Sequence, residues 1–171
     1  MKKLVIASAI AMTMTAGSAM ASQGDVQFFG NVTAETCDLV PEIGGAVNNM
    51  IQLGTVKVGA EGNDIEFSLK KAPGANCTAA AAKDATITWM GNLGTDGIMK
   101  QGGLAEGAYV VLTAKNSKTA DTAITSTQSS VEFDKAELDK AGYKFTAKLD
   151  AQKATTPGDF QSSAAYAVTY K

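Results

Sequence analysis

Two cysteines are the residues of this chain whose chemistry follows most directly from type and spacing. Cys37 and Cys77 lie forty residues apart. In an oxidising compartment such a pair forms a disulfide, and closing a loop of that length would stabilise the fold by about 4 kcal/mol. A metal-binding pair is the weaker alternative, because the chain has no histidine and no second cysteine pair to complete a zinc site. The spacing therefore predicts a structural disulfide.

Catalytic chemistry has little support in the sequence. Without histidine the commonest general base is missing, and no GxSxG motif, glycine-rich phosphate loop or metal-ligand cluster is present. The acidic residues are scattered at predicted turns and strand ends and form no evident catalytic pair. Trp89, the single tryptophan, is expected in the core or an interface, with a sugar-stacking platform as the alternative. We expect no enzyme, no cofactor and no metal site.

The first 21 residues have the pattern of a secretory signal peptide. Lys2 and Lys3 precede an apolar run at 4–12, and small residues end in the A-x-A cleavage pattern of 19–21. The apolar run is too short to cross a bilayer. A retained amphipathic anchor is the alternative. The leader predicts export, which places the cysteines in an oxidising compartment.

The charge of the mature chain argues against two classes of partner. Cleavage after residue 21 would start the chain near Ser22 and leave 150 of the 171 residues, one domain by size. Removing two of the 15 basic residues leaves 13 lysines against 17 acidic residues, a net charge of −4, with no arginine. Nucleic acids and anionic membranes both require a basic surface. We expect a soluble, exported domain that binds neither.

The last fourteen residues, 158–171, show the period of a strand with one buried face. The larger and apolar residues of one parity are Phe160, Ala164, Tyr166, Val168 and Tyr170. They continue to the penultimate position, although chain ends usually fray unless something holds them. If no later strand pairs with this one, an edge with open backbone hydrogen-bonding groups remains. Such an edge needs a partner.

Alternating patterns elsewhere predict further short strands separated by turns. These strands are expected at 26–32, 51–58 (broken by Gly54), 65–69, 87–89, 109–114, 131–133 and 143–149. Turns are expected around Pro41 and Gly44-Gly45, and helical turns only at 78–83 and 134–141. The pattern predicts an all-β sandwich of immunoglobulin-like type, with a barrel as the alternative.

Taken in their order along the chain, these features resemble those of the major subunits of chaperone-usher fimbriae, the type-1 pilin superfamily. They resemble in particular those of the main pilins of gut-colonising enteric bacteria. The resemblance spans the mature chain. It rests on the Val26-x-Phe28-x-Gly30-x-Val32 row before Cys37, the cysteine spacing, the Ile51-x-Leu53-Gly54 stretch, Gly158 at the fourteenth position from the end, and the penultimate Tyr170. It implies an incomplete immunoglobulin-like β-sandwich that lacks its last strand. A donor strand from a chaperone or a neighbouring subunit would complete the fold.

The resemblance also assigns roles along the chain. Residues 22–34 would be an N-terminal donor-strand extension and residues 35–171 the pilin domain. The donor row, inserted into a neighbour's groove, would be Val26, Phe28, Gly30 and Val32, with Gly30 over a shallow part of the groove floor. The C-terminal strand of the acceptor groove would include Gly158, Tyr166, Val168, Tyr170 and Lys171, whose carboxylate would anchor a chaperone. For Tyr166, Val168 and Tyr170, ordinary core packing is the alternative.

The implied function is that of a structural subunit of an adhesive surface fimbria, polymerising by donor-strand exchange and supporting cell adhesion and virulence. The implied partners are identical subunits in a homopolymer, a periplasmic chaperone, an outer-membrane usher, and minor fimbrial subunits with a tip adhesin. The subunit would travel through the periplasm to the cell-surface fimbrium. The alternative is a major subunit that is itself a carbohydrate-binding adhesin. Loops 91–103 and 117–130 could then hold the glycan, although neither contains an aromatic residue.

Overall fold

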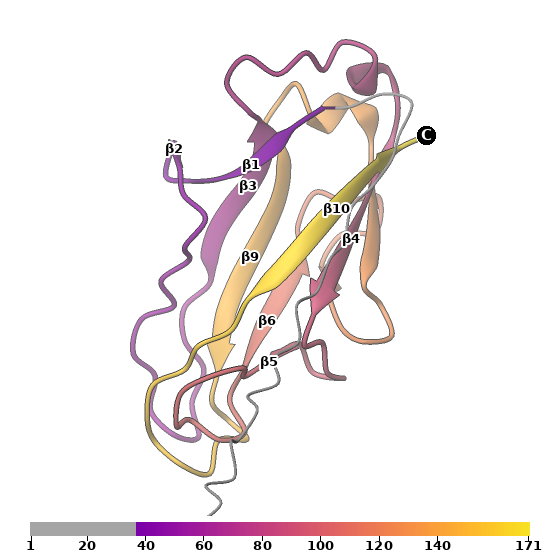
Figure 1. Ribbon diagram of the computed structural model, residues 1–171. Coiled ribbons are helices and arrows are strands. Elements are labelled where there is room, and N and C mark those ends of the chain that lie inside the picture. The colour runs from indigo at the N-terminus through magenta and orange to yellow at the C-terminus, as the bar shows by residue number, and fades with distance from the viewer. Residues whose placement is uncertain (1–36) are drawn as a thin grey trace, which may run out of the picture.

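The computed structural model describes residues 37–171, which form two antiparallel sheets (Figure 1). The predicted signal peptide (1–21) and donor-strand extension (22–34) lie outside the described residues. The strands are β1 (Leu39–Ile43), β2 (Ala46–Val47), β3 (Ile65–Lys71), β4 (Ala85–Gly91), β5 (Ile98–Met99), β6 (Tyr109–Ala114), β7 (Thr122–Ala123), β8 (Ser130–Phe133), β9 (Tyr143–Asp150) and β10 (Ala164–Tyr170). The larger sheet has the order β2-β1-β3-β9-β6-β5, with β7 paired to β6, and the smaller sheet has the order β10-β4-β8.

Alternating side chains of the two sheets meet in one apolar core. Phe67 of β3, Trp89 of β4 and Phe145 of β9 are buried there, with the Trp89 ring 5.3 Å from that of Phe145. Phe67 stacks on Phe145 at 5.5 Å. Ile124, in the otherwise polar segment 117–130, is fully buried. The all-β sandwich predicted from the alternation is confirmed.

Helical structure is confined to two single turns. They are the 3-10 turns η1 (Ala80–Ala82) and η2 (Lys135–Glu137), each inside a segment where a helical turn was expected. The Asp134 side chain caps η2 by accepting a hydrogen bond from the Ala136 amide. Within residues 37–171, no helix is long and apolar enough to cross a membrane.

The closing strand is shorter than the sequence pattern predicts. β10 starts at Ala164, so Phe160 lies in the connection before it. Gly158, with φ of +155°, and the hydrogen bonds from the Gln101 and Gly102 amides to the Gln161 carbonyl tie this connection to another loop. From Ala164 onward β10 pairs with β4 alone among the described strands. It is therefore an edge strand, as the sequence predicts.

Two other predictions for the first half of the domain are wrong. Residues 51–58 join no ladder among the described residues, because Gly54 has a positive φ of +77° and the apolar residues on its two sides differ in parity. Pro41, expected in a turn, lies in β1 opposite Leu69. β2 pairs only with Glu42 and Ile43, so Pro41 lies beyond the reach of β2, where a missing N–H is tolerated.

Candidate functional site

A long apolar groove of about 1220 Å³ opens between the two sheets beside β10. Residues 49–58 form one wall, and residues 156–164 with Tyr166 form the other. The floor consists of core side chains of both sheets, namely Phe67, Leu69, Trp89, Ile98, Val110, Leu112, Ala147 and Leu149. The floor of the groove is thus the core of the sandwich itself.

The groove follows from the way the two walls are built. β10 has β4 on one side and no described strand on the other, and segment 49–58 belongs to no ladder. In Figure 1 this segment descends from β2 along the left of the molecule, and the yellow chain leading into β10 rises from the lower left toward the centre. The space between these walls has the shape that an extended segment fills, and it is lined by apolar surface.

The side chains that form the groove floor differ in size along the length of the groove. One part carries the Trp89 ring, whose centroid lies 6.3 Å from that of Phe67 and 5.5 Å from that of Tyr166. The Nε1 atom of Trp89 is buried and has no hydrogen-bond partner among the described residues. Another part is lined by the small side chains of Ala105 and Ala108. A segment bound here would therefore need side chains of unequal size.

The end of the groove near Ala105 is closed by two loops that approach very closely. The Gln101 amide donates to the Gln161 carbonyl at 2.9 Å, and the Ala105 amide donates to the Asp159 carbonyl at 3.1 Å. A Cβ atom at Gly103 would lie 2.1 Å from the Asp159 carbonyl oxygen, far inside contact distance. Only glycine at this position allows the two backbones to pack, so the end of the groove is rigidly defined.

The predicted C-terminal site residues occupy two different environments. Gly158 and Tyr166 line the groove. The Tyr166 hydroxyl donates to the Leu39 carbonyl at 2.8 Å, and burial raises the pKa of this phenol. Val168 and Tyr170 pack against the core beyond the groove.

Backbone and hydroxyl contacts fix the C-terminal end of β10. The Tyr170 hydroxyl lies 3.5 Å from the Cys37 carbonyl oxygen, and burial, with a smaller effect of Asp38, raises its pKa to about 12. The Lys171 amide donates to the Asp84 carbonyl at 2.9 Å. The chain end is thereby anchored next to the residue at which the described chain begins.

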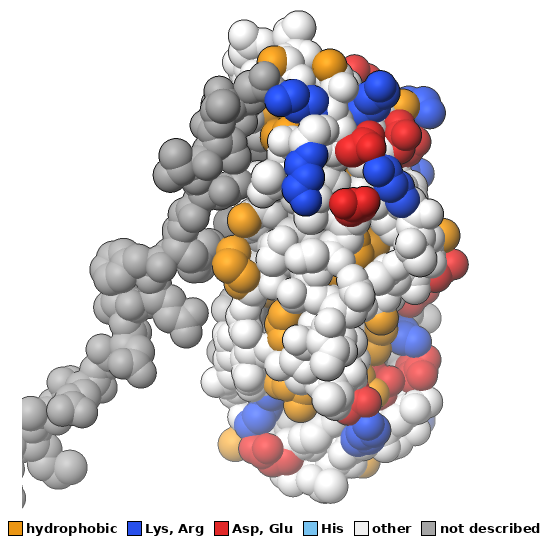
Figure 2. Space-filling model, turned by 90° about the vertical axis from the view of Figure 1, so that its right-hand side faces the viewer, with side chains coloured by type: hydrophobic (Ala, Val, Ile, Leu, Met, Phe, Trp, Pro, Cys, Tyr) orange, Lys and Arg blue, Asp and Glu red, His pale blue; other side chains and the backbone are white. Residues whose placement is uncertain are grey.

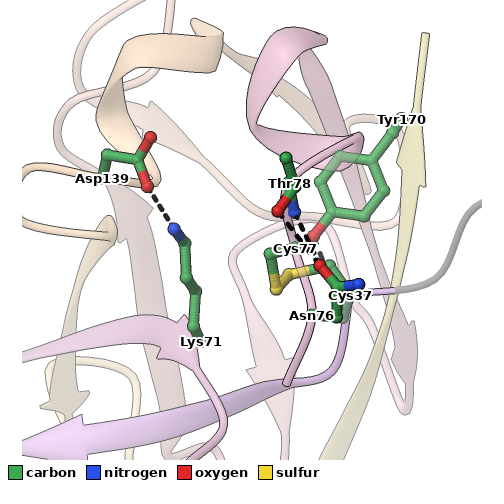
Figure 3. The surroundings of a disulfide bond; sticks show 7 residues. All are labelled: Cys37, Lys71, Asn76, Cys77, Thr78, Asp139 and Tyr170. Atoms are coloured by element: carbon green, nitrogen blue, oxygen red, sulfur yellow. Dashed lines mark hydrogen bonds and ion pairs between the residues drawn. A yellow bond between two sulfur atoms is a disulfide. The ribbon is translucent and has the colours of Figure 1, made fainter. Parts of the chain in front are cut away.

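The predicted disulfide between Cys37 and Cys77 is confirmed (Figure 3). The two Cα atoms are 4.7 Å apart, within the range that a disulfide requires. The bridge ties the start of the described chain to the turn before η1. Residues 37–171 contain no free cysteine and no cluster of three or more potential metal ligands.

Charged side chains of both signs gather near one end of the face shown in Figure 2. Among the described residues, Lys118 pairs with Asp84 at 2.6 Å and with Glu132 at 3.7 Å. The Lys118 hydrogen bond, helped by the Lys135 amide, lowers the pKa of Asp84. Ion pairs of this kind give the surface a mixed charge, unlike the basic stripe that nucleic-acid binding requires.

Neither the wall at 49–58 nor the floor residues Ala105 and Ala108 can be identified from the sequence. The alternation of Ile51 and Leu53 predicts a ladder strand, yet Val56 lies on the other parity. That shift across Gly54 is the signal of a segment that leaves the ladder. Ala105 and Ala108 carry no pattern of their own, because small residues are common in loops.

Curated fimbrial proteins match the chain over most or all of its length, whereas no profile of a known protein family matches it. The F107 fimbrial protein of Escherichia coli is 49% identical over 172 residues, covering all of both chains. The K99 fimbrial protein of Escherichia coli is 32% identical over 120 residues, 68% of this chain and 66% of its own. The Major MR/P fimbria protein of Proteus mirabilis (strain HI4320) is 27% identical over 179 residues, 100% of this chain and 99% of its own.

Among solved structures, the P pilus rod subunit PapA has a similar fold. Its crystal structure superposes with a TM-score of 0.51 at 20% sequence identity, covering 87% of this chain and 100% of that chain. At this identity the comparison establishes the architecture of the sandwich, while the curated relatives carry the evolutionary relationship.

Proposed function

The chain belongs to the family of fimbrial major subunits, and from this we propose that its groove accepts an extended strand of another copy of the chain. Membership makes it a structural subunit of a cell-surface fimbria, as the sequence resemblance implies. The expectation that it is not an enzyme agrees with its relatives, which are structural subunits. The proposal concerns how such subunits are joined.

The observation that carries the proposal is the apolar groove beside an edge strand. The groove of about 1220 Å³ runs over core residues, and the apolar side chains of its walls, such as Leu53 and Phe160, are only partly buried. Apolar surface in water costs about 25 cal/mol per Å², so filling the groove is strongly favourable. An extended segment fills it best, because it also pairs with a strand edge.

The N-terminal stretch of the next subunit supplies this segment. Its row Val26, Phe28, Gly30 and Val32 presents apolar side chains of unequal size on one face of an extended chain. Burial of the two valines and the phenylalanine contributes roughly 1.5–3 kcal/mol each, about 5–9 kcal/mol in all. In this proposal Gly30 would lie over the part of the floor that carries the Trp89 ring, where little depth is left.

Before assembly, the open core requires another partner. A periplasmic chaperone lends a strand to the same groove and anchors the Lys171 carboxylate, and exchange follows at an outer-membrane usher. The route starts with removal of residues 1–21, leaving the donor-strand extension at 22–34 and the pilin domain at 35–171. The fibre grows as a homopolymer beneath minor subunits and a tip adhesin.

A pair of substitutions in the donor row tests the proposal. Gly30→Asn adds a side chain where the floor leaves no room, and Gln27→Asn changes a residue of the opposite parity as the matched control. We expect the Gly30 variant to accumulate as a chaperone complex without fibres and the Gln27 variant to assemble normally, measured by electron microscopy and periplasmic pull-down. Fibres of normal length from Gly30→Asn would refute the donor-strand role.

The carbohydrate-binding alternative gains no support from the structure. The two loops that could hold a glycan lie against each other, with the Ser126 amide donating to the Gly94 carbonyl at 2.8 Å. Neither loop contains an aromatic side chain for stacking on a sugar. Binding of purified fibres without the tip adhesin to host cells would revive this alternative.

A further inference from the structure

An exposed leucine stands at the closed end of the groove. Leu104 is 68% exposed, the highest fraction among the large hydrophobic residues of the described chain. Its backbone is nevertheless held tightly, because Gly103 packs on Asp159 and a Cβ atom at Gly158 would lie 2.5 Å from that of Leu104. A side chain exposed on a rigid support loses little conformational freedom when it docks into another surface.

A shallow hollow lies at the opposite end of the molecule. It has a volume of about 480 Å³, and its apolar lining includes Ala75, Cys77, Ala81 and Ala82. The ion pair between Lys71 and Asp139 forms part of its rim, and Figure 3 shows this pair on one side of the view and the disulfide on the other. Asn76 and Thr78 complete the lining, and the hollow is large enough to receive one aliphatic side chain against its alanines.

The hollow adjoins the point at which the N-terminal stretch joins the domain. Cys77, part of its lining, is bonded to Cys37, the first described residue. Between Val32, the last residue of the donor row, and Cys37 there are five residue steps. A fully extended chain spans about 3.4 Å per residue, so these five steps cover at most roughly 17 Å. The hollow of a donating subunit therefore stays close to the end of its own donor strand.

The direction in which the donor strand inserts decides which end of the accepting subunit lies next to the hollow of the donating subunit. Every strand pair in the described residues is antiparallel, and antiparallel pairing is slightly more stable than parallel pairing. A donor strand antiparallel to β10 ends where β10 begins, beside the loops of residues 100–107 and 153–163. Figure 1 shows these loops at the end of the molecule opposite the C-terminus. Leu104 stands on the first of them.

We infer that Leu104 of the accepting subunit inserts into the hollow beside the disulfide of the donating subunit, as a second contact between neighbouring copies. The inference rests on the proposed donor-strand exchange. Leu104, the knob of this contact, and the hollow lie at opposite ends of one chain. The contact is therefore heterologous, and it repeats along a fibre without closing into a ring. It adds a second point of attachment between neighbouring subunits and so sets the angle between them.

Cysteine cross-linking within assembled fibres tests the contact. The double variant Leu104→Cys with Ala82→Cys places one thiol on the knob and one in the hollow. Leu104→Cys with Ala120→Cys is the matched control, because Ala120 is an exposed alanine outside the hollow. After mild oxidation, we expect a ladder of covalent multimers on denaturing gels from the first variant only. Fibres without a ladder, or equal ladders from both variants, would overturn the inference and leave the donor strand intact.

A substitution without new thiols provides an independent measurement. Leu104→Ala removes the knob but leaves the groove lining unchanged. We expect fibres that form but dissociate about 10- to 100-fold faster in heated detergent, in line with the burial of one leucine. An unchanged dissociation rate would overturn the knob contact. Normal fibres from Gly30→Asn would instead overturn the donor strand itself.

Discussion

The close approach at Gly103 allows the cost of a single methyl group to be worked out from a matched pair of glycines. Gly103 has φ of +87° and Gly59 has φ of +83°, so alanine pays a similar backbone penalty of about 1–2 kcal/mol at either position. The two positions differ in the space that is available to the added methyl group. A Cβ atom at Gly59 meets nothing within 4 Å, whereas one at Gly103 would lie 2.1 Å from the Asp159 carbonyl oxygen.

The difference between the two variants isolates the packing of the groove end. At Gly103 the Asp159 backbone must move, at an overpacking cost of about 1–3 kcal/mol. The hydrogen bond from the Ala105 amide to Asp159 then weakens, at about 0.5–1.5 kcal/mol. We expect Gly103→Ala to be less stable than Gly59→Ala by about 2–4 kcal/mol, a difference in Tm of roughly 4–16 °C.

Urea unfolding of the mature monomers, followed by the fluorescence of the single tryptophan, measures this difference. Fluorescence is a suitable probe because Trp89 lies on the floor of the groove. Equal stability of the two variants would refute the reasoning, since it would mean that the two loops separate at no cost. The groove end would then be soft rather than rigid.

Three further predictions concern the disulfide, the tyrosine hydroxyls and alkaline pH. Replacing both Cys37 and Cys77 by serine should lower the free energy of unfolding by about 4 kcal/mol, which urea titration checks against the oxidised wild type. Tyr166→Phe should cost about 1 kcal/mol, because it removes the 2.8 Å bond to the Leu39 carbonyl, whereas Tyr170→Phe, whose bond is 3.5 Å long, should cost less; equal losses would contradict the ranking. Burial raises the pKa of Tyr170 to about 12 and that of Tyr143 as well, so the folded state keeps protons that unfolded phenols release near pH 10. The stability should therefore be fully present below about pH 10 and fall from there toward about pH 12, and urea midpoints that are equal at about pH 9 and about pH 11 would contradict this.

The sequence predicts the elements that are regular and buried. Strands with a clean period of two, such as β3, β6 and β9, lie where the alternation places them, and the two cysteines meet as their spacing predicts. Their apolar faces are specified residue by residue, because a slip of one position would expose every buried side chain. The same alternation predicts that the chain ends in an edge strand.

The walls of the groove could not be predicted in the same way. Residues 51–58 resemble a strand but have no described partner, and Phe160 shares the parity of β10 without belonging to it. Both contact the core of the sandwich from the rim of the groove. A pattern of apolar residues predicts that a side chain is buried. It does not predict whether the same chain supplies a neighbouring strand to pair with.

The stability of such a subunit is divided between the chain and its assembly. Phe67, Leu69 and Trp89 are almost fully buried although they line the groove. The walls are different, since Ile51, Leu53 and Phe160 are only partly buried against the core. A strand that fills the groove would cover these side chains and leave the floor almost unchanged. The free energy of binding such a strand would therefore come chiefly from contacts with the walls. Substitutions in the walls should weaken strand exchange more than they weaken the fold.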